Sequence, residues 1–332
     1  MYSRPNKAFA AMAASILLVG ASAAAQDTAP LGTLPPATDA DRALLRDAID
    51  VHTHLDPDSF GPHSVQAARA LDVIAMAQRA KQAGMRGFVI KQHYDQTAQL
   101  AYLTNKAVPE VEVFGQLSLN LTVGGLNPAA VFHFGEVKGG RARIVSMPTW
   151  DSENNVRSSR TPDRPFVRVS HDGELLPETK AVIAAVATAK VRDTGVPLAL
   201  STGHITAAEA LKVIREARKQ GITRIIVTHA IGHPIGMTMA QMKEAASLGA
   251  YIEFVAGFLI GQRATFTAQQ YYDAIRAIGP EHVILSSDGG QTGRPMPDEM
   301  IAMVAGQLRA KGMSSAELRK IMVENPAALL GL

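Results

Sequence analysis

Two histidines two positions apart, His52 and His54, end a short apolar run that begins at Ile49. Such a run is typical of a buried strand, and the two-residue period of a strand places both imidazoles on one face. A single histidine there would more often be an ordinary buried polar residue. Two neutral imidazoles on one face can bind one transition metal, because imidazole is a good ligand for such ions. The spacing therefore predicts a metal site at this strand end.

Three more metal-competent residues stand at the polar ends of later apolar runs. His204 closes PLALSTGH, His229 closes IIVTH and Asp288 closes VILSSD. We expect all five side chains to converge on one rim from four different strands. A ligand set of histidine nitrogens and one carboxylate suits Zn²⁺ best, and Mn²⁺, Fe²⁺ and Ni²⁺ are the alternative metals. Asp288 could bind the metal, accept a proton from a metal-activated water, or do both.

The elements that position these residues alternate along the chain. Eight strands are expected, over 49–54, 87–93, 111–119, 143–147, 197–201, 224–228, 251–255 and 283–286. Helical patterns separate them, over 64–83, 96–107, 128–138, 178–194, 207–220, 239–248 and 267–278, after a short amphipathic helix at 41–47. Strands that alternate with helices pair in parallel through right-handed crossovers, which predicts a (β/α)8 TIM barrel. The rival is an open doubly wound sheet, which usually has a glycine-rich turn after its first strand, and none follows His54.

One long segment, residues 151–177, follows the fourth strand and interrupts the alternation. It is polar, carries four arginines and contains a predicted hairpin around His171, Asp172 and Gly173. After a barrel strand it would lie over the C-terminal mouth, where active sites occur, so it is either a binding loop or a solvated excursion. Its arginines mildly favour an anionic substrate.

The ordered pattern of His-x-His on strand one, a histidine on strands five and six and an aspartate on strand eight resembles the amidohydrolase superfamily. The resemblance spans about residues 50–332, includes the closing NPAALLGL, and is nearest to a poorly characterised branch. It implies that His52, His54 and Asp288 hold the more buried metal. It further implies that His204 and His229 hold a second ion or join the first site. The implied chemistry is attack of a metal-activated water on a carbonyl or phosphoryl centre, with Asp288 moving the proton.

The sequence departs from that family at strand four, where many binuclear relatives carry a bridging carboxylated lysine or glutamate. Here the strand ends in Met147-Pro148-Thr149-Trp150, and Asp151 and Glu153 just beyond are weak candidates. Lys91 and His93 on strand two share a face. Lys91 could become carboxylated and bridge two ions, bind substrate, or pair with a barrel carboxylate such as Glu253.

Four residues are candidates for substrate contact. They are His93, Glu253, His233 in the Gly232-His233-Pro234 turn, where a loop histidine is by default a surface residue, and Gln291 after the Gly289-Gly290 pair, as a hydrogen-bond donor.

The N-terminus predicts export to the periplasm or the medium. Arg4 and Lys7 precede an apolar run too short for a membrane span, and small residues place signal-peptide cleavage after Ala23 or Ala25. We expect residues 26–40 to form a linker and residues 41–332 to form a single barrel domain. Cleavage after Ala25 removes two of the 33 basic and none of the 30 acidic residues, leaving a net charge of +1. That balance indicates no nucleic-acid or membrane partner, and the chain has no cysteine to ligate metal or act as nucleophile.

The sequence thus favours a metal-dependent hydrolase with one or two ions, acting on a small molecule through an amide, cyclic amide, ester or lactone bond. Metal-dependent decarboxylation or phosphoester cleavage on the same scaffold is the alternative. A non-catalytic periplasmic protein that binds a ligand through its metal is a third reading. The sequence is also compatible with a homo-oligomer.

Overall fold

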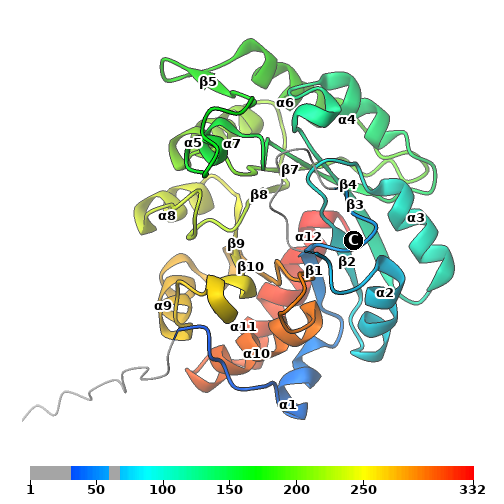
Figure 1. The fold of residues 1–332 in the computed structure, drawn as a ribbon, viewed down its shortest axis with the longest axis vertical. Coiled ribbons are helices and arrows are strands. Elements are labelled where there is room, and N and C mark those ends of the chain that lie inside the picture. The colour runs from blue at the N-terminus through cyan, green and yellow to red at the C-terminus, as the bar shows by residue number, and fades with distance from the viewer. Residues whose placement is uncertain (1–30, 60–67) are drawn as a thin grey trace, which may run out of the picture.

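The computed structural model describes residues 31–59 and 68–332, and its centre is a sheet of eight parallel strands in the order β1-β2-β3-β4-β7-β8-β9-β10 (Figure 1). The strands are β1 Ile49–Thr53, β2 Gly87–Ile90, β3 Glu112–Ser118, β4 Ala142–Ser146, β7 Ala199–Ser201, β8 Ile225–Val227, β9 Tyr251–Val255 and β10 Val283–Ser286. All eight lie where the sequence predicted them, and five of them are shorter than predicted by one to three residues.

The first and last strands close the sheet on itself. The backbone N–H of His54 donates to the carbonyl of Gly289 at 2.8 Å, and that of Asp288 donates to the carbonyl of His52 at 3.0 Å. An open sheet would leave these groups at two separate edges. The prediction of a (β/α)8 barrel is therefore confirmed, and the doubly wound alternative is wrong.

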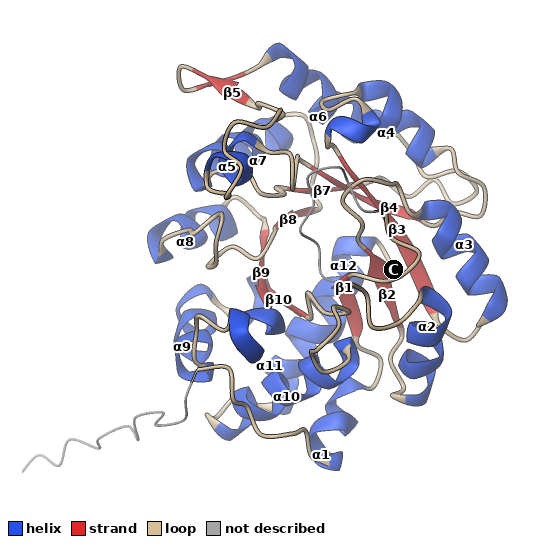
Figure 2. Cartoon of the chain, viewed as in Figure 1, coloured by secondary structure: helices blue, strands red, loops and turns tan. Residues whose placement is uncertain are grey.

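Helices surround the barrel (Figure 2). They are α1 Asp39–Arg42, α2 Val73–Gln82, α3 Ala98–Ala107, α4 Pro128–Gly135, α5 Glu153–Arg157, α6 Pro177–Thr188, α7 Ala207–Lys219, α8 Met239–Ser247, α9 Ala268–Ile278, α10 Pro297–Ala310, α11 Ser315–Arg319 and α12 Asn325–Leu330. The predicted hairpin exists as β5 Ser170–His171 and β6 Glu174–Leu175. Within the described residues, no helix has the length and apolar character that a bilayer span needs.

Several other predicted boundaries differ from the structure, and three of them have a clear local reason. The helix expected from Ser64 begins only at Val73, because the Asp72 side chain caps it; Ser64 itself lies outside the described residues. The helix expected to reach residue 194 ends at Thr188, because the chain turns extended at Ala189. The last part of the predicted linker is folded, since Thr38 caps α1 and Ala37 is buried in the core. The predicted signal peptide and its cleavage sites lie outside the described residues.

An irregularity in β1 explains how its histidines face the barrel interior. Asp50 pairs with Phe88 and Thr53 with Ile90, so two residues, Val51 and His52, stand opposite one on β2. Val51 packs into the apolar lower core of the barrel, yet its neighbour His52 also reaches the interior above it. The Asp50 carboxylate supports this bend by accepting the backbone N–H of His52 at 3.1 Å. The period of two then holds from His52 to His54.

The lower half of the barrel is filled by apolar side chains and closed by the last helix. Ile49, Phe114 and Ile284 from three strands pack with Leu329 and Leu330 of α12. The polar residues of the interior therefore gather at the opposite end, which is the C-terminal end of the strands.

Candidate metal centre

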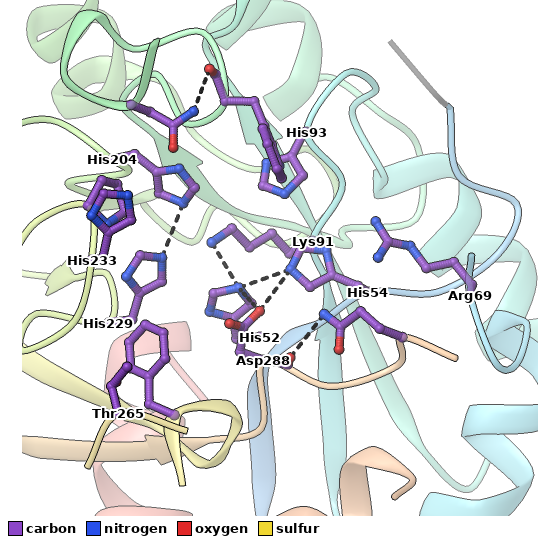
Figure 3. A pocket seen from close by; sticks show the side chains of 15 residues that line it. His52, His54, Arg69, Lys91, His93, His204, His229, His233, Thr265 and Asp288 are labelled. Carbon is purple, nitrogen blue, oxygen red and sulfur yellow. Dashed lines mark hydrogen bonds and ion pairs between the residues drawn. The ribbon is translucent and has the colours of Figure 1, made fainter. Parts of the chain in front are cut away.

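A cavity of about 390 Å³ opens at the C-terminal ends of the barrel strands (Figure 3). All five predicted ligand residues line it: His52, His54, His204, His229 and Asp288. Each follows or ends its strand, so the parallel arrangement brings the five side chains to one rim.

The first group joins the two histidines of β1 to the aspartate after β10. The Nε2 atoms of His52 and His54 lie 3.2 Å apart. Asp288 Oδ1 lies 3.1 Å from His54 Nε2 and 3.3 Å from His52 Nε2. These three side chains form a compact potential ligand set.

The second group is the pair formed by His204 and His229. Their Nε2 atoms are 3.1 Å apart, and the ring of His229 stacks at 6.0 Å on that of His52. Four imidazoles therefore turn the same nitrogen inward, two from each side of the cavity (Figure 3).

The donor set fits a divalent transition metal. Two ligand atoms in a tetrahedral zinc site, each about 2.0–2.1 Å from the ion, lie about 3.3 Å apart. The measured separations of 3.1–3.3 Å agree with this value. Paired nitrogens at this distance make at most one hydrogen bond with each other, and a cation between them satisfies both lone pairs.

Electrostatics keep the donors in the state that metals require. Burial lowers the pKa of His54 to about 3 and that of His229 to about 4, and it lowers the pKa of His204 well below its usual value. For Asp288, burial raises the pKa, but the charge of His52 and the hydrogen bond from His54 outweigh it and hold the pKa well below 3.8. His54, His204 and His229 are thus neutral and the Asp288 carboxylate is ionised at neutral pH.

Glu253 on β9 lies behind His52, and it does not line the cavity. Its Oε1 accepts from His52 Nδ1 at 3.0 Å, and its Oε2 accepts the backbone N–H of His229 at 2.7 Å. This bond puts the proton of His52 on Nδ1 and leaves Nε2 as a lone-pair donor. Glu253 thus contacts a predicted ligand residue from outside the cavity, whereas the sequence suggested that it contacts substrate.

Lys91 lies between the two histidine groups. It is buried, and its Nζ lies 2.9 Å from His52 Nε2 (Figure 3). Burial lowers the pKa of Lys91 against the opposing charges of Glu253 and Asp288. The two weaker candidates for a bridge lie elsewhere: Asp151 pairs with Arg164 at 2.6 Å, and Glu153 with Arg168 at 2.7 Å.

The other predicted contact residues, His93, His233 and Gln291, do line the cavity. Gln291 was expected as a donor, but its Nε2 already donates to the Asp288 carbonyl at 3.1 Å. Within the described residues its buried Oε1 has no partner, so the amide also offers an acceptor.

Sequence reasoning missed several cavity residues, among them Arg69, Asn155, Phe258 and Thr265. They lie in the connecting segments after β1, β4 and β9, where the sequence carries no long periodic signal. Arg69 forms a buried ion pair with Asp58, and it is the arginine that lines the cavity.

The segment 151–177 contributes to the cavity wall, but not through its arginines. Trp150 just before it and Asn155 in α5 line the cavity. Ser152 Oγ and Asn154 Nδ2 donate to the His204 carbonyl at 2.9 and 3.0 Å, so the segment also holds a ligand residue in place. Three of its four arginines, Arg157, Arg164 and Arg168, pair with acids of the same segment. None of the four lines the cavity, so the inference of an anionic substrate from them loses its basis.

Two of the predicted ligand residues occupy unusual backbone conformations. His229 has φ 23° and Asp288 has φ 48°, a region that non-glycine residues rarely adopt. Next to Asp288, a side chain at Gly290 (φ 111°) would overlap the carbonyl oxygen of His54. Backbone strain of this kind concentrates at functional sites.

Three solved structures share this architecture. Phosphotriesterase homology protein from Escherichia coli, complexed with phosphate in its active site, is 18% identical and covers 86% of this chain and 98% of its own, with a TM-score of 0.57. A mutant phosphotriesterase-like lactonase from Deinococcus radiodurans is 17% identical over 87% and 97%, with a TM-score of 0.56. An amidohydrolase from Burkholderia multivorans with bound zinc is 13% identical over 86% and 99%, with a TM-score of 0.56.

The chain therefore shares its barrel fold with these three structures. A family model matches residues 47–253, and the chain belongs to that family, DUF6282, a family of unknown function. No protein with a curated description matches the chain in sequence. The matched region contains all four inward-facing histidines and Lys91, and it ends before Asp288.

Proposed function

We propose that this chain is a metal-dependent hydrolase that uses a metal-activated water to cleave an amide, cyclic amide, ester or lactone bond. The observation that carries the proposal is the convergence of four imidazole Nε2 atoms and one carboxylate in a single cavity. Such a donor set lacks sulfur, which favours zinc as the metal.

The residues take distinct roles in this proposal. His52, His54 and Asp288 hold the first ion, and His204 and His229 hold a second ion or complete the first site. Metal there would acidify water and polarise the electrophile. Asp288 lies at the rim with its carboxylate ionised, so it is the base that accepts the proton of the attacking water and later delivers it to the leaving group.

Lys91 is the proposed bridge between the two groups. Its buried amine, between His52 and the second histidine pair, can attack CO₂ when neutral, forming an N–C bond and releasing one proton. The resulting carbamate would supply two oxygen ligands. Growth with ¹³C-bicarbonate followed by ¹³C NMR of the zinc-loaded protein tests this, because a Lys91→Met variant must lose the carbamate signal.

The size and lining of the cavity support a small-molecule substrate, with His233 and Gln291 at its wall. We also propose export of the chain, with cleavage after Ala23 or Ala25, which N-terminal sequencing of the periplasmic fraction would test.

The first experiment measures metal content after loading with Zn²⁺, Mn²⁺, Fe²⁺ or Ni²⁺. We expect one or two ions per chain. His52→Gln should lower this metal content, whereas His171→Gln, which changes an exposed histidine of the hairpin, should leave it unchanged. A chain that binds no transition metal under any loading condition would contradict the proposal. The second experiment is a screen of amides, lactones and phosphoesters. We expect Asp288→Asn to keep its metal and to have a kcat at least 100-fold lower than that of the wild type. Turnover of phosphoesters alone would move the assignment to that reaction.

A further inference from the structure

His93 is a cavity histidine outside the two groups described above, and its ring is held differently from the four histidines of those groups. Its ring centroid lies 5.1 Å from that of His54 and 5.8 Å from that of His204, so it faces both groups (Figure 3). The edge of Trp150 packs against it at 5.3 Å and 88°. Its Nδ1 lies 2.9 Å from the hydroxyl of Thr149, a contact of a kind that the other four do not make.

Asn120, at the end of β3, determines the direction of the hydrogen bonds around that hydroxyl. The backbone N–H groups of Thr149 and Asp151 donate to Asn120 Oδ1 at 2.9 and 3.2 Å, which identifies the oxygen of the amide. The amide nitrogen therefore donates, to the His93 carbonyl at 2.6 Å and to Thr149 Oγ1 at 2.7 Å. Asn120 is fully buried, and this network satisfies its whole amide.

The network decides which nitrogen of His93 carries the proton. Thr149 is fully buried, and its oxygen accepts from Asn120, so its own O–H needs an acceptor. Within the described chain, His93 Nδ1 is the one acceptor that Thr149 Oγ1 reaches. If Nδ1 carried a proton, the hydroxyl would be a buried donor without a partner, which is costly. Nδ1 is therefore the acceptor, and the proton lies on Nε2.

From this we propose that His93 is a catalytic residue whose Nε2–H donates to the carbonyl oxygen of a carboxylic acid derivative. This inference rests on the proposed function and deepens it. A protonated Nε2 has no lone pair for a metal, which separates His93 from the four ligands. A fixed neutral donor at the wall of the cavity stabilises the negative charge that develops on the oxygen as water attacks the carbonyl carbon. Thr149 and Asn120 are positioning residues that fix the tautomer.

The tautomer is measured directly on the ¹⁵N-histidine-labelled chain, metal-free and zinc-loaded. The His93 resonances are assigned by their absence in His93→Gln. We expect an unprotonated Nδ1 and a protonated Nε2 in both states, whereas Nε2 of the four ligands shifts with zinc. Thr149→Val should change the protonation pattern of His93, and Thr149→Ser should restore it. An unprotonated Nε2, or one that shifts as the ligands do, overturns the inference.

A binding measurement tests the donor role without turnover. Methylphosphonate serves as the probe, because its oxyanion imitates the charge that builds up on a carbonyl oxygen. We expect His93→Gln to weaken methylphosphonate binding to the zinc-loaded chain at least 10-fold with unchanged zinc content. His171→Gln is the matched control and should bind as the wild type does. Equal affinity in His93→Gln overturns the donor role.

Kinetics distinguish failure of this inference from failure of the proposed function. On any carbonyl substrate found by the screen, His93→Gln should lower kcat about 100- to 1,000-fold, and Thr149→Ser should recover most of the loss seen in Thr149→Val. If the wild type turns over and His93→Gln matches it, the inference fails and the hydrolase assignment stands. If the wild type cleaves no carbonyl substrate, the hydrolase assignment fails, while the tautomer and methylphosphonate results still decide the role of His93 as a donor.

Discussion

Replacement of Glu253 by glutamine tests the claim that a buried carboxylate prepares His52 for metal. The wild-type carboxylate accepts three hydrogen bonds, from His52 Nδ1 at 3.0 Å, the His229 backbone N–H at 2.7 Å and Ser286 Oγ at 2.6 Å. Burial raises the pKa of Glu253, but the charge and hydrogen bond of His52 outweigh it and lower the pKa to about 2. The group is therefore an anion at any pH at which zinc binds.

The glutamine can reproduce only part of this pattern. If its oxygen faces His52 and Ser286, its NH₂ group confronts the backbone N–H of His229, and two donors oppose each other. If the amide is flipped, its nitrogen faces His52, and the Nδ1–H of His52 loses its acceptor. Either way one charge-assisted bond of about 1.5–3 kcal/mol is lost. Loss of such a partner behind a ligating histidine typically lowers metal affinity by about 10- to 100-fold.

The assay is a zinc titration against a competing chelator at pH 7, with thermal unfolding of the metal-free chains measured in parallel. Glu244→Gln is the matched control, because it removes the same charge from an exposed residue that pairs with Arg215 on the surface. We expect the control to match the wild type in zinc affinity. A folded Glu253→Gln chain that binds zinc within twofold of the wild type would refute the role of Glu253.

Two further predictions concern pH and backbone shape. The metal-free chain should lose stability as the pH falls from about 6.5 to 4. Unfolded imidazoles take up protons in that range, whereas His229 and His54, with pKa values of about 4 and 3, stay neutral. Chemical denaturation with chelator at pH 7, 6 and 5 measures this, and a flat profile contradicts it. Gly290→Ala should unfold at lower temperature and bind zinc at least 10-fold more weakly, because the methyl group would displace the His54 carbonyl. Gly221→Ala, with φ 87° and open space around it, controls for left-handed strain alone, about 1–2 kcal/mol, and equal losses in both would exclude displacement of His54.

Local patterns in the sequence were sufficient to predict the barrel fold and the convergence of five residues: His52, His54, His204, His229 and Asp288. A strand's period gives the face of a side chain, and the change from apolar to polar residues gives the strand's end. Parallel strands share that end, so His52, His204 and Asp288 could be assigned to one rim without coordinates. The same rule applied to β3 and β4 points to Asn120 and Thr149, which were not singled out because their types suggest turns as readily as function.

Partners and orientation were decided by the tertiary structure alone. Glu253 meets His52 across 201 positions of sequence, and Thr149 meets His93 across 56. The irregularity in β1 that turns His52 inward depends on how β1 pairs with β2. The ion pairs of Arg157, Arg164 and Arg168 likewise depend on which acids are folded against them. Residue types and spacing thus determined that this protein has a metal-competent histidine cluster. Which nitrogen of each ring faces the cavity depends on hydrogen bonds between distant segments, and such bonds leave no periodic trace in the sequence.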